Sequence, residues 1–573
     1  MSFIKEKENE INNILKELEY DVDAIILPSS KKELGDFQLN IAMSIAKKYH
    51  KNPRMVADEI VNKLPNSFCN VNIANPGFIN FSFSDLDLIN YFNESLYNFQ
   101  RLYDKKEEKL IFLDYGGANA AKALHVGHMR SANIGEALNR LCKFLGLKTI
   151  SDVHLGDLGR QAGMIISEIE IREPDLAFFD ENYKGEYPKV NYTASDLGEM
   201  YVKANIASSE DENRLARVRE ITAEIDKGNE RYIALWKQLV SISSVEIKKV
   251  YDKLHCNFDL WEGELDSFKD VKPMLEVLNP YLYESEGAMV MDVKEDTDTK
   301  EMPPLIVIKK DGATIYATRD LATIYSRIKR FNPNEIWYVV DSRQSLYFEQ
   351  VFRASYKSNL VPKNTVLSHL GFGTINGRDG KPYKTRDGGV MELSTLIKLI
   401  SDEIDKNIKD DITGSEREEI NNKLTVATLK YADLMSNRST DYIFDEVKFS
   451  SFEGKTGPYL LYTDVRIKSI LNKIDSKNYK FINISNLDMK NVLLKILELP
   501  NILNRSYLDK SLNPITDFLF DLCSLFNKFY NNYSIIKEEN IDIKSSYLAL
   551  IKLVKEVLEQ LLDILAIEVV DRM

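Results

Sequence analysis

A chain of 573 residues is longer than one hydrophobic core usually organises, so several domains are expected. Hydrophobic residues make up 44% of the chain and charged residues 28%, a composition typical of globular proteins, and no apolar run approaches the roughly 20 residues of a membrane-spanning helix. Because the net charge is −13, any nucleic-acid partner has to meet local basic patches on an acidic molecule.

The first residues, "MSFIKEKENEINNILKEL", predict an amphipathic helix. They have helical periodicity and lack the apolar core of a signal peptide. The cysteines are far apart and form no CxxC pair, which argues against a disulfide framework and a zinc knuckle; they are Cys69, Cys142, Cys256 and Cys523. We therefore expect a cytoplasmic protein with no membrane partner.

Residues 1–105 are predicted to form a small α+β domain. Helical periodicity over residues 36–64 gives way to the alternating run "FINFSFS" after Pro76 and Gly77. The charged stretch "DKKEEK" at residues 104–109 is predicted to be a linker to the next domain.

Residues 106–390 are predicted to form a nucleotide-binding α/β domain. The segment "LIFLDYG" is typical of a buried strand, and a Gly/Ala-rich turn and a helix starting near His125 follow it. Strand-like "LIVIKK" (305–310) and "EIWYVVD" (335–341) flank a helical pattern over 319–331, and this alternation predicts that both strands join a parallel sheet. The charged, helical residues from about 160 to 300 show little strand character and are predicted to be an insertion.

Residues 391–573 have helical periodicity almost throughout and predict a C-terminal all-α helical bundle. Within it, "EGKTG" contains the Gly-Lys-Thr of a phosphate-binding P-loop. A P-loop also requires Gly five positions before Gly454, where this chain has Phe449. The segment is therefore predicted to be a turn that leads into a helix.

His125 and His128 stand one turn apart at the predicted start of the helix near residue 125. A metal site is disfavoured because HxxH lacks the i, i+4 spacing of zinc-binding helices and needs further ligands. Histidines that merely cap the helix are the simpler alternative. A strand, a Gly-rich turn and a helix start, however, gather backbone N–H groups at the positive end of the helix dipole, which favours a bound phosphate. Gly127 between the histidines lets a base or ribose approach the backbone.

Several motifs resemble one family. "HVGH" resembles the HIGH element of class I aminoacyl-tRNA synthetases, and the preceding "GGANAAKAL" resembles arginyl-tRNA synthetases in particular. "HLGDLGRQAG", "YATRDLA", "HLGFGTINGRDGKPYKTRDGGVMEL" and "FEGKTGPYLLYTDVR" are similar to further elements of that family, and "LGDFQLNIAMSIAKK" and "NPGFINF" to its N-terminal domain. The resemblance covers nearly the whole chain with the motifs in matching order.

The resemblance implies a bacterial-type arginine–tRNA ligase. The expected fold is a Rossmann-type catalytic domain between an N-terminal α+β domain that binds tRNA and a C-terminal helical domain that binds the anticodon. The expected substrates are L-arginine, tRNA-Arg and ATP as its Mg²⁺ complex, with no structural metal, and the expected state is a monomer. The family also implies that activation of arginine requires bound tRNA.

For ATP, the resemblance assigns catalytic phosphate contacts to His125 and His128, and adenine packing to Gly127. The usual KMSKS loop is replaced by "PYKTRDGG", and the family implies that Lys122, just before the HIGH element, takes over the role of the missing lysine. Further ATP-binding candidates are Lys381, Lys384 and Arg386, for which a solvated basic loop is an equal alternative.

For arginine, the resemblance assigns carboxylates to the guanidinium group, which pairs with them bidentately, and polar side chains to the ends of the substrate. The residues are Asp114, Asn119, Tyr316, Asp320 and Gln344. Two departures from the family are Gly117, where other members have Ser, and Asp114 itself, where some have Glu. Helix or turn capping is the alternative role for both aspartates.

For tRNA, aromatic and basic side chains at the start of the C-terminal domain suit stacking on unpaired anticodon bases; they are Tyr459, Tyr462 and Arg466. Core packing is the alternative for the tyrosines. Tyr547 stands where the family often has Arg, so no contact of that arginine is expected here. The alternative functions are a non-catalytic sensor and a class I synthetase for another amino acid. The intact HVGH element disfavours the first, and Lys122 with the Tyr316/Asp320 pair disfavours the second.

Overall fold

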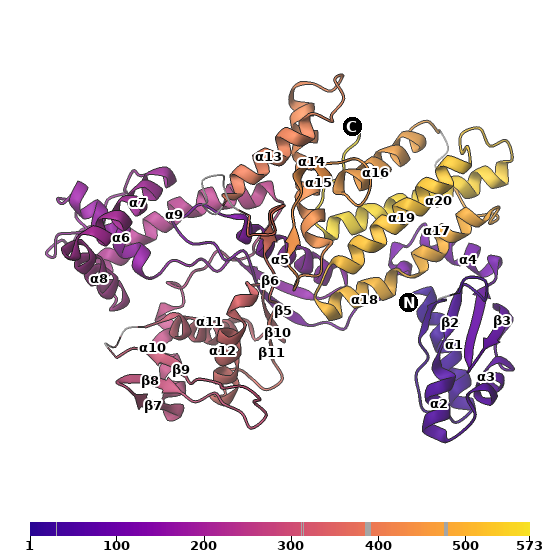
Figure 1. The fold of residues 1–573 in the computed structure, drawn as a ribbon, viewed down its shortest axis with the longest axis horizontal. Coiled ribbons are helices and arrows are strands. Elements are labelled where there is room, and N and C mark those ends of the chain that lie inside the picture. The colour runs from indigo at the N-terminus through magenta and orange to yellow at the C-terminus, as the bar shows by residue number, and fades with distance from the viewer. Residues whose placement is uncertain (30, 311, 313, 384–390, 475–478) are drawn as a thin grey trace.

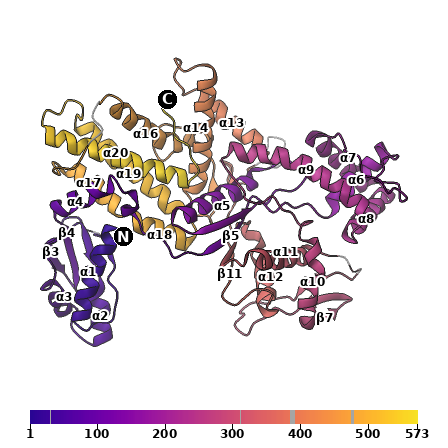
Figure 2. The ribbon, with the colours of Figure 1, turned by 180° about the vertical axis from the view of Figure 1, so that it is seen from behind.

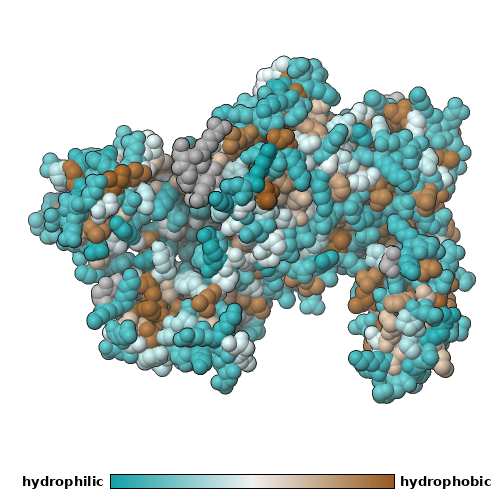
Figure 3. Space-filling view, in the orientation of Figure 1, coloured by the Kyte–Doolittle hydropathy of each residue, from teal (hydrophilic) through white to brown (hydrophobic). Residues whose placement is uncertain are grey.

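The computed structural model describes residues 1–573 except 30, 311, 313, 384–390 and 475–478. A parallel sheet lies near the centre, with a helical lobe and a mixed lobe on one side and the C-terminal helices and N-terminal domain on the other (Figure 1). In the space-filling view a wide gap separates the N-terminal domain from the mixed lobe (Figure 3). The predicted order of an α+β, an α/β and a helical part is confirmed.

The N-terminal domain is an antiparallel sheet of order β1-β2-β4-β3 packed against helices. Its elements are α1 (Phe3–Glu17), β1 (Ile26–Pro28), β2 (Phe37–Leu39), α2 (Ile41–Tyr49), α3 (Pro53–Val61), β3 (Phe68–Ala74), β4 (Phe78–Phe83) and α4 (Asp85–Ser95), followed by the 3-10 turn η1 (Phe99–Leu102). The prediction that residues 36–64 are helical was wrong for the first residues, which form β2. Phe37 and Leu39 point into the core on either side of Gln38, which is the two-residue period of a strand.

The central sheet has the order β11-β10-β5-β6 and is parallel throughout. Its elements are β5 (Leu110–Asp114), α5 (Val126–Phe144), β6 (Lys148–Asp152), β10 (Glu335–Tyr338) and β11 (Val366–His369). The chain runs from β5 through α5 to β6 on one side of β5, and β10 pairs with its other side. The strand order therefore reverses between β5 and β10, where open α/β sheets place a binding crevice at the carboxyl ends of the strands.

A helical segment and a mixed segment follow β6. The helices are α6 (Arg160–Arg172), α7 (Ala194–Glu210), α8 (Glu212–Asp226), α9 (Glu230–Lys253) and α10 (Phe268–Leu278) with the turn η2 (Asn279–Tyr281). The mixed part contains β7 (Leu282–Ser285), β8 (Ala288–Met291), β9 (Leu305–Ile308), α11 (Tyr316–Phe331), η3 (Ser342–Gln344) and α12 (Ser345–Lys357).

Two predictions about this region were wrong. The strand at 305–308 exists as β9, but it pairs antiparallel with β8 in a separate sheet of order β7-β8-β9. Only one face of β9 is covered, since Ile306 is 46% exposed, whereas strands of a parallel sheet are buried on both faces. The expected insertion also contains β7 and β8, joined by Glu286 and Gly287, which both have positive φ as a tight hairpin turn requires.

The C-terminal part is helical, apart from a short parallel pair of β12 (Ile375–Asn376) with β13 (Tyr442–Ile443). The helices are α13 (Leu393–Asp405), α14 (Gly414–Leu434), α15 (Glu446–Phe449), α16 (Gly457–Leu471), α17 (Leu487–Leu497), α18 (Leu499–Asp509), α19 (Asn513–Asn532) and α20 (Ile541–Ile564). Thr456 caps α16 by accepting a hydrogen bond from the Tyr459 N–H at 3.2 Å. The Gly-Lys-Thr segment therefore leads into a helix, as predicted.

Helix α5 lies between the parallel sheet and the C-terminal helices, and it contacts α13, α14, α18 and α20 (Figure 2). At the other end of the molecule, the Asn93 amide in α4 exchanges hydrogen bonds of 2.7 and 2.8 Å with the backbone of Phe481. Lys490 in α17 forms an ion pair with Asp85 in α4 at 3.0 Å. The N-terminal and C-terminal parts are thus joined directly.

The four cysteines are free. Among the described residues, no helix is long and apolar enough to cross a membrane.

Candidate active site

The candidate site lies where the strand order reverses, at the carboxyl ends of β5 and β10. The turn after β5 is fixed to its surroundings by backbone hydrogen bonds. The Gly117 N–H donates to Val153 at 3.2 Å, and the Ala120 N–H donates to Gly156 at 3.1 Å. Ala121 adopts a positive φ of 55°, and its N–H donates to the Ser243 hydroxyl of α9 at 3.0 Å. The turn therefore has one conformation, supported by both the sheet and the helical insertion.

The two histidines form the N-terminal cap of α5. His125 is the N-cap residue, and its Nδ1 accepts a hydrogen bond from the Gly127 N–H at 3.1 Å. The Nδ1 of His128 accepts one from the His125 N–H at 3.0 Å, and the two rings stack with centroids 3.8 Å apart. Because an Nδ1 that accepts carries no proton, each neutral ring must carry its proton on Nε2. Both Nε2 atoms are thus hydrogen-bond donors beside the helix N-terminus.

Both imidazoles are held in the neutral form. Burial lowers the pKa of His128 to about 3, helped by repulsion from the His125 ring whenever that ring is protonated and by the charge of Lys122. Burial also lowers the pKa of His125. The pair therefore keeps its Nε2 donors unchanged around neutral pH, and its interaction with a phosphate is that of two directed dipoles next to the helix dipole.

The His125 ring leaves little room for a side chain at Gly127. A Cβ at this position would lie 3.0 Å from Cε1 and 3.1 Å from Nδ1 of the His125 ring. Glycine thus lets the imidazole fold back over the first turn of α5, in addition to leaving the backbone open to a flat ligand.

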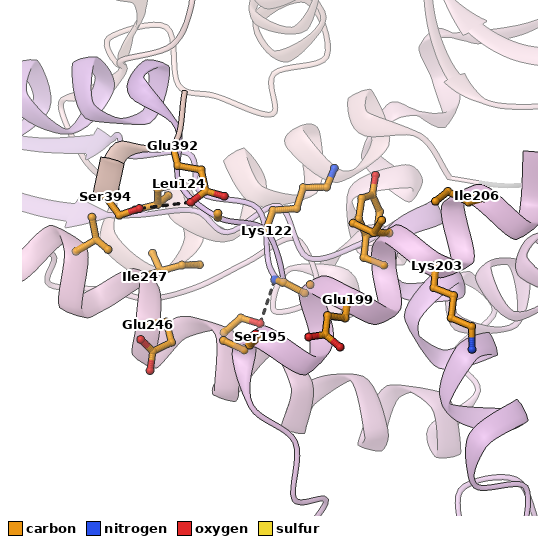
Figure 4. A pocket seen from close by; sticks show the side chains of 18 residues that line it. Lys122, Leu124, Ser195, Glu199, Lys203, Ile206, Glu246, Ile247, Glu392 and Ser394 are labelled. Carbon is orange, nitrogen blue, oxygen red and sulfur yellow. Dashed lines mark hydrogen bonds between the residues drawn. The ribbon is translucent and has the colours of Figure 1, made fainter. Parts of the chain in front are cut away.

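Lys122 projects from the turn toward the helical insertion. Its ammonium lies 4.8 Å from the centre of the Tyr201 ring of α7, which is a cation–π contact. In Figure 4 the Lys122 side chain points away from Leu124 and Glu392. It borders a largely apolar cavity of about 840 Å³ between the turn, α7, α9 and the start of α13.

A buried charge cluster lies at the carboxyl ends of β5 and β6. Their register places Asp114 opposite Asp152, so the two carboxylates are neighbours. Arg327 of α11 bridges them, with Nη1 2.7 Å from Asp114 and Nη2 2.7 Å from Asp152. The three side chains are almost fully buried, and the arginine also stacks on Phe112 at 4.4 Å. The predicted guanidinium partner Asp114 therefore already holds a guanidinium of the protein itself.

Asp320 is a carboxylate of this region that forms no ion pair with a described side chain. Within the described ranges, no Lys, Arg or His nitrogen lies within 4.0 Å of it, and its hydrogen-bond donor is the Tyr347 hydroxyl of α12. Burial raises the pKa of Asp320, which is half-buried, and the charge of Asp114 adds to this increase. The Tyr347 hydrogen bond and the charges of His154 and Arg327 oppose the increase without cancelling it. Asp320 is thus an acceptor near cations but without a direct ion pair among the described residues.

His154 follows β6 and faces the same carboxylates. Its Nδ1 lies 3.8 Å from Asp152, and both ring nitrogens are buried without a hydrogen-bond partner. Burial disfavours the charged ring, but the attraction of Asp152 and Asp114 outweighs burial and raises the pKa of His154 to about 9. His154 is therefore a second internal cation of the cluster. No group of three His, Cys, Asp or Glu side chains in the described part of the chain is placed to hold a metal ion.

The other predicted arginine-binding residues come from three separate elements. Asn119 is half-buried against Gly156, where a Cβ would lie 2.5 Å from its Oδ1. Gln344 is exposed at the start of α12. Tyr316 begins α11 and is 67% exposed, with Arg319 over its ring. The phenol hydrogen-bonded to Asp320 is that of Tyr347, a residue that the sequence reasoning did not select.

Of the predicted basic loop residues, Lys381 is exposed shortly after β12. Lys384 and Arg386 lie outside the described residues. The predicted tRNA-binding residues share α16, where the Arg466 guanidinium lies 4.8 Å from the Tyr462 ring and 4.9 Å from the Tyr530 ring. Arg466 also donates to Asn527 at 2.6 Å, and the Tyr459 hydroxyl accepts from the same amide group at 3.0 Å. The three side chains therefore form one surface cluster.

Arg327 and His154 were also missed by the sequence reasoning. A usable signal existed for Arg327, since it stands seven residues after Asp320 and so on the same face of the helix. No comparable local signal marks Tyr347, because it reaches Asp320 from a different helix.

Three family models match the chain. "tRNA synthetases class I (R), catalytic domain" matches residues 93–446, "DALR anticodon binding domain" residues 460–573, and "Arginyl tRNA synthetase N terminal domain" residues 5–83. Relatives named arginine–tRNA ligase are 42% identical in Alkaliphilus oremlandii, over 98% of both chains, and 42% identical in Agathobacter rectalis, over 95% of both.

Solved structures show the same fold. The arginyl-tRNA synthetase of Plasmodium falciparum superposes with a TM-score of 0.82 at 24% identity, covering 100% of this chain and 99% of that one. The arginyl-tRNA synthetase of Thermus thermophilus gives a TM-score of 0.81 at 19% identity, with full coverage of both chains.

Proposed function

Since this chain belongs to the arginyl-tRNA synthetase family, we propose how its own residues carry out the ligation of arginine to tRNA. The chain is a class I ligase that uses ATP. In the first step an arginine carboxylate oxygen attacks the α-phosphorus of ATP, and the bond from that phosphorus to the bridging oxygen breaks to give arginyl-adenylate and pyrophosphate. In the second step a hydroxyl of the terminal adenosine of tRNA-Arg attacks the arginyl carbonyl and AMP leaves.

ATP is held at the N-terminal end of α5. The Nε2–H groups of His125 and His128 donate to phosphate oxygens, and the helix dipole favours the same negative charge. Adenine packs over Gly127. ATP enters as its Mg²⁺ complex, so the ion belongs to the substrate. Because phosphoryl chemistry depends mostly on positioning and charge stabilisation, two fixed neutral donors suit this step.

Lys122 supplies the positive charge that "PYKTRDGG" lacks at the place of the usual second lysine. Its contact with Tyr201 of the insertion indicates that its position depends on an element outside the nucleotide site. We therefore expect activation to require tRNA, with the ammonium moving to the phosphates when the acceptor end docks. Pyrophosphate exchange measured with and without tRNA tests this, and equal rates would count against it.

Arginine is recognised through the charge balance of the cluster. Arg327 and His154 neutralise Asp114 and Asp152, so neither of these two carboxylates binds the guanidinium of the substrate. Asp320 remains available, and a guanidinium fork pairs with it bidentately beside the Tyr347 hydroxyl. The substrate ammonium and carboxylate lie toward Asn119 and Gln344, and Tyr316 covers the pocket from the start of α11.

The RNA is bound by the two terminal parts of the chain. The surface cluster of Tyr459, Tyr462 and Arg466 on α16 suits stacking on anticodon bases, because a guanidinium already stacks there on two phenol rings. The N-terminal domain contacts the tRNA elbow. We also propose that the ligase acts as a cytoplasmic monomer, which sedimentation with and without tRNA tests.

The single observation that best supports arginine as the substrate is the half-buried Asp320 carboxylate, which forms no ion pair with any described side chain. The direct test is tRNA charging with each of the twenty labelled amino acids in parallel. Arginine alone should be attached. Attachment of another amino acid would refute the assignment of the pocket, and no attachment of any would indicate a non-catalytic relative.

A further inference from the structure

A buried arginine joins α5 to two segments far away in the sequence. Arg130 lies one turn below Val126, the first residue of α5, and is fully buried. Its Nε lies 3.2 Å from the carboxylate of Asp433 in α14, which is fully buried as well. The other oxygen of Asp433 accepts a hydrogen bond from Asn133 of α5 at 3.0 Å. The helix that carries the two histidines is thus held to the C-terminal helices by an internal ion pair.

The same guanidinium also holds the short strand pair β12–β13. Nη1 of Arg130 donates to the carbonyl of Thr440 at 2.9 Å and to that of Thr374 at 3.4 Å. Thr374 directly precedes β12, and Thr440 lies two residues before β13. The ring of Tyr442 in β13 lies 5.0 Å from the guanidinium. One side chain therefore fixes both segments against the first turns of α5.

The chain returns to the same turn of α5 after the β12 segment. Met391 accepts a hydrogen bond from the Val126 N–H at 3.3 Å, and the Leu393 N–H donates to Leu124 at 2.8 Å. Residues 391–393 therefore lie beside the histidine cap, and Arg130 holds Thr374 and Thr440 one turn further along the same helix.

An ion pair at this depth is not explained by stability alone. Well-packed apolar residues in place of a buried pair often stabilise a protein as well or better, because two charges must be removed from water. The pair is also incompletely bonded. Nη2 of Arg130 has no hydrogen-bond partner among the described residues, and the contact between Nε of Arg130 and Oδ1 of Asp433 is an ion pair without hydrogen-bond geometry. An apolar side chain, however, could not hold two carbonyl groups and a carboxylate at once, whereas the planar fork of an arginine can.

We propose that Arg130 is a positioning residue for adenylate formation. It aligns the β12–β13 segments with the histidine cap of α5, and its ion pair with Asp433 fixes it to the C-terminal helix α14. The inference rests on the proposed role of His125 and His128. Arg130 touches no substrate; it acts by fixing the groups that do. Displacements of about 1 Å at such groups cost up to roughly 10²-fold in rate.

The test uses variants of the full-length chain that separate charge from geometry. Arg130→Lys keeps the positive charge beside Asp433 but lacks the fork that reaches the two carbonyl groups. The double variant Arg130→Met with Asp433→Asn removes both charges and keeps an amide oxygen for Asn133. Arg140→Lys is the matched control, because Arg140 is also on α5 and also joins a C-terminal helix, through Asp563 at 2.7 Å, but it lies far from the histidines.

Pyrophosphate exchange with tRNA present, which gives kcat and KM for adenylate formation, and thermal unfolding are measured for each variant. We expect Arg130→Lys to lower kcat roughly 10- to 100-fold with KM values within about threefold, and the double variant to be folded and at least as slow. Arg140→Lys should match the wild type. A folded Arg130→Lys variant with wild-type kcat overturns the inference. Recovery of kcat in the double variant overturns it as well, and so does failure of both variants to fold. Each of these last two outcomes would mean that the ion pair serves stability alone. If the wild type itself does not charge arginine, the proposed function fails instead.

Discussion

Replacing Asp320 by asparagine should weaken arginine binding without affecting ATP. The amide can still accept a hydrogen bond from Tyr347, so the packing between α11 and α12 is retained. The negative charge is lost, however, and the nearby carboxylates cannot replace it, because Arg327 holds Asp114 and Asp152 at 2.7 Å each. The substrate guanidinium is then left without a counter-charge.

The size of the effect follows from this geometry. Removing one partner of a buried charge pair costs about 3–5 kcal/mol, and the lower end applies because Asp320 is half-buried. Since about 1.4 kcal/mol corresponds to tenfold, kcat/KM for arginine should fall by at least about 100-fold. KM for ATP should stay within about threefold, because the histidine cap lies on a different helix.

Steady-state aminoacylation with arginine and ATP varied separately measures both constants. Glu262→Gln is the matched control. The Glu262 carboxylate binds Arg330, which is on α11 like Asp320, through two surface contacts of 2.7 Å. It should behave as the wild type. An unchanged kcat/KM for arginine in Asp320→Asn, or a rise confined to KM for ATP, would refute the assignment of Asp320 to the guanidinium.

Three further outcomes are expected. Lys122→Ala should slow adenylate formation about 10²–10³-fold and leave transfer from preformed adenylate nearly normal in single-turnover assays, and a rate within about twofold of wild type would contradict its role. Burial raises the pKa of Asp320 above its ordinary 3.8, and only the ionised carboxylate pairs with a guanidinium. KM for arginine should therefore rise as pH falls from neutrality toward the pKa of Asp320. The Asp320→Asn variant should not show this rise. Gly135→Ala should destabilise the protein by about 1–3 kcal/mol or more in urea unfolding, because its Cβ would lie 2.1 Å from the Tyr115 ring; Gly198→Ala, with open space around its Cβ, should not.

Local chemistry made the start of α5 predictable. A helix N-terminus is set by a few consecutive residues, so the histidine pair, Gly127 and the preceding turn could be placed from the sequence. The helix over 319–331 followed from its period of 3.6 residues. The sequence could not, however, show which nitrogen of each histidine carries the proton, because that depends on the hydrogen bonds to the two Nδ1 atoms.

Pairings between distant residues were not predictable in the same way. Asp114 and Asp152 become neighbours only through the register of β5 with β6, and Arg327 reaches them from a helix far along the chain. The sheet to which β9 belongs was wrongly predicted for the same reason, since an alternation of strand and helix does not say which strands pair. These non-local contacts account for most of what the sequence reasoning missed in the proposed arginine pocket.

The contact between Asn93 and Phe481 affects the order in which the protein can mature during synthesis. The two residues are 388 positions apart, and ribosomes add roughly 5–20 residues per second, so roughly 20–80 s separate their appearance. The N-terminal sheet and its helices are complete within the first hundred or so residues and can fold early. During that interval the amide of Asn93 can bond only to water or to another partner. The docking of the N-terminal domain on the C-terminal helices is therefore a late event in the synthesis of the chain.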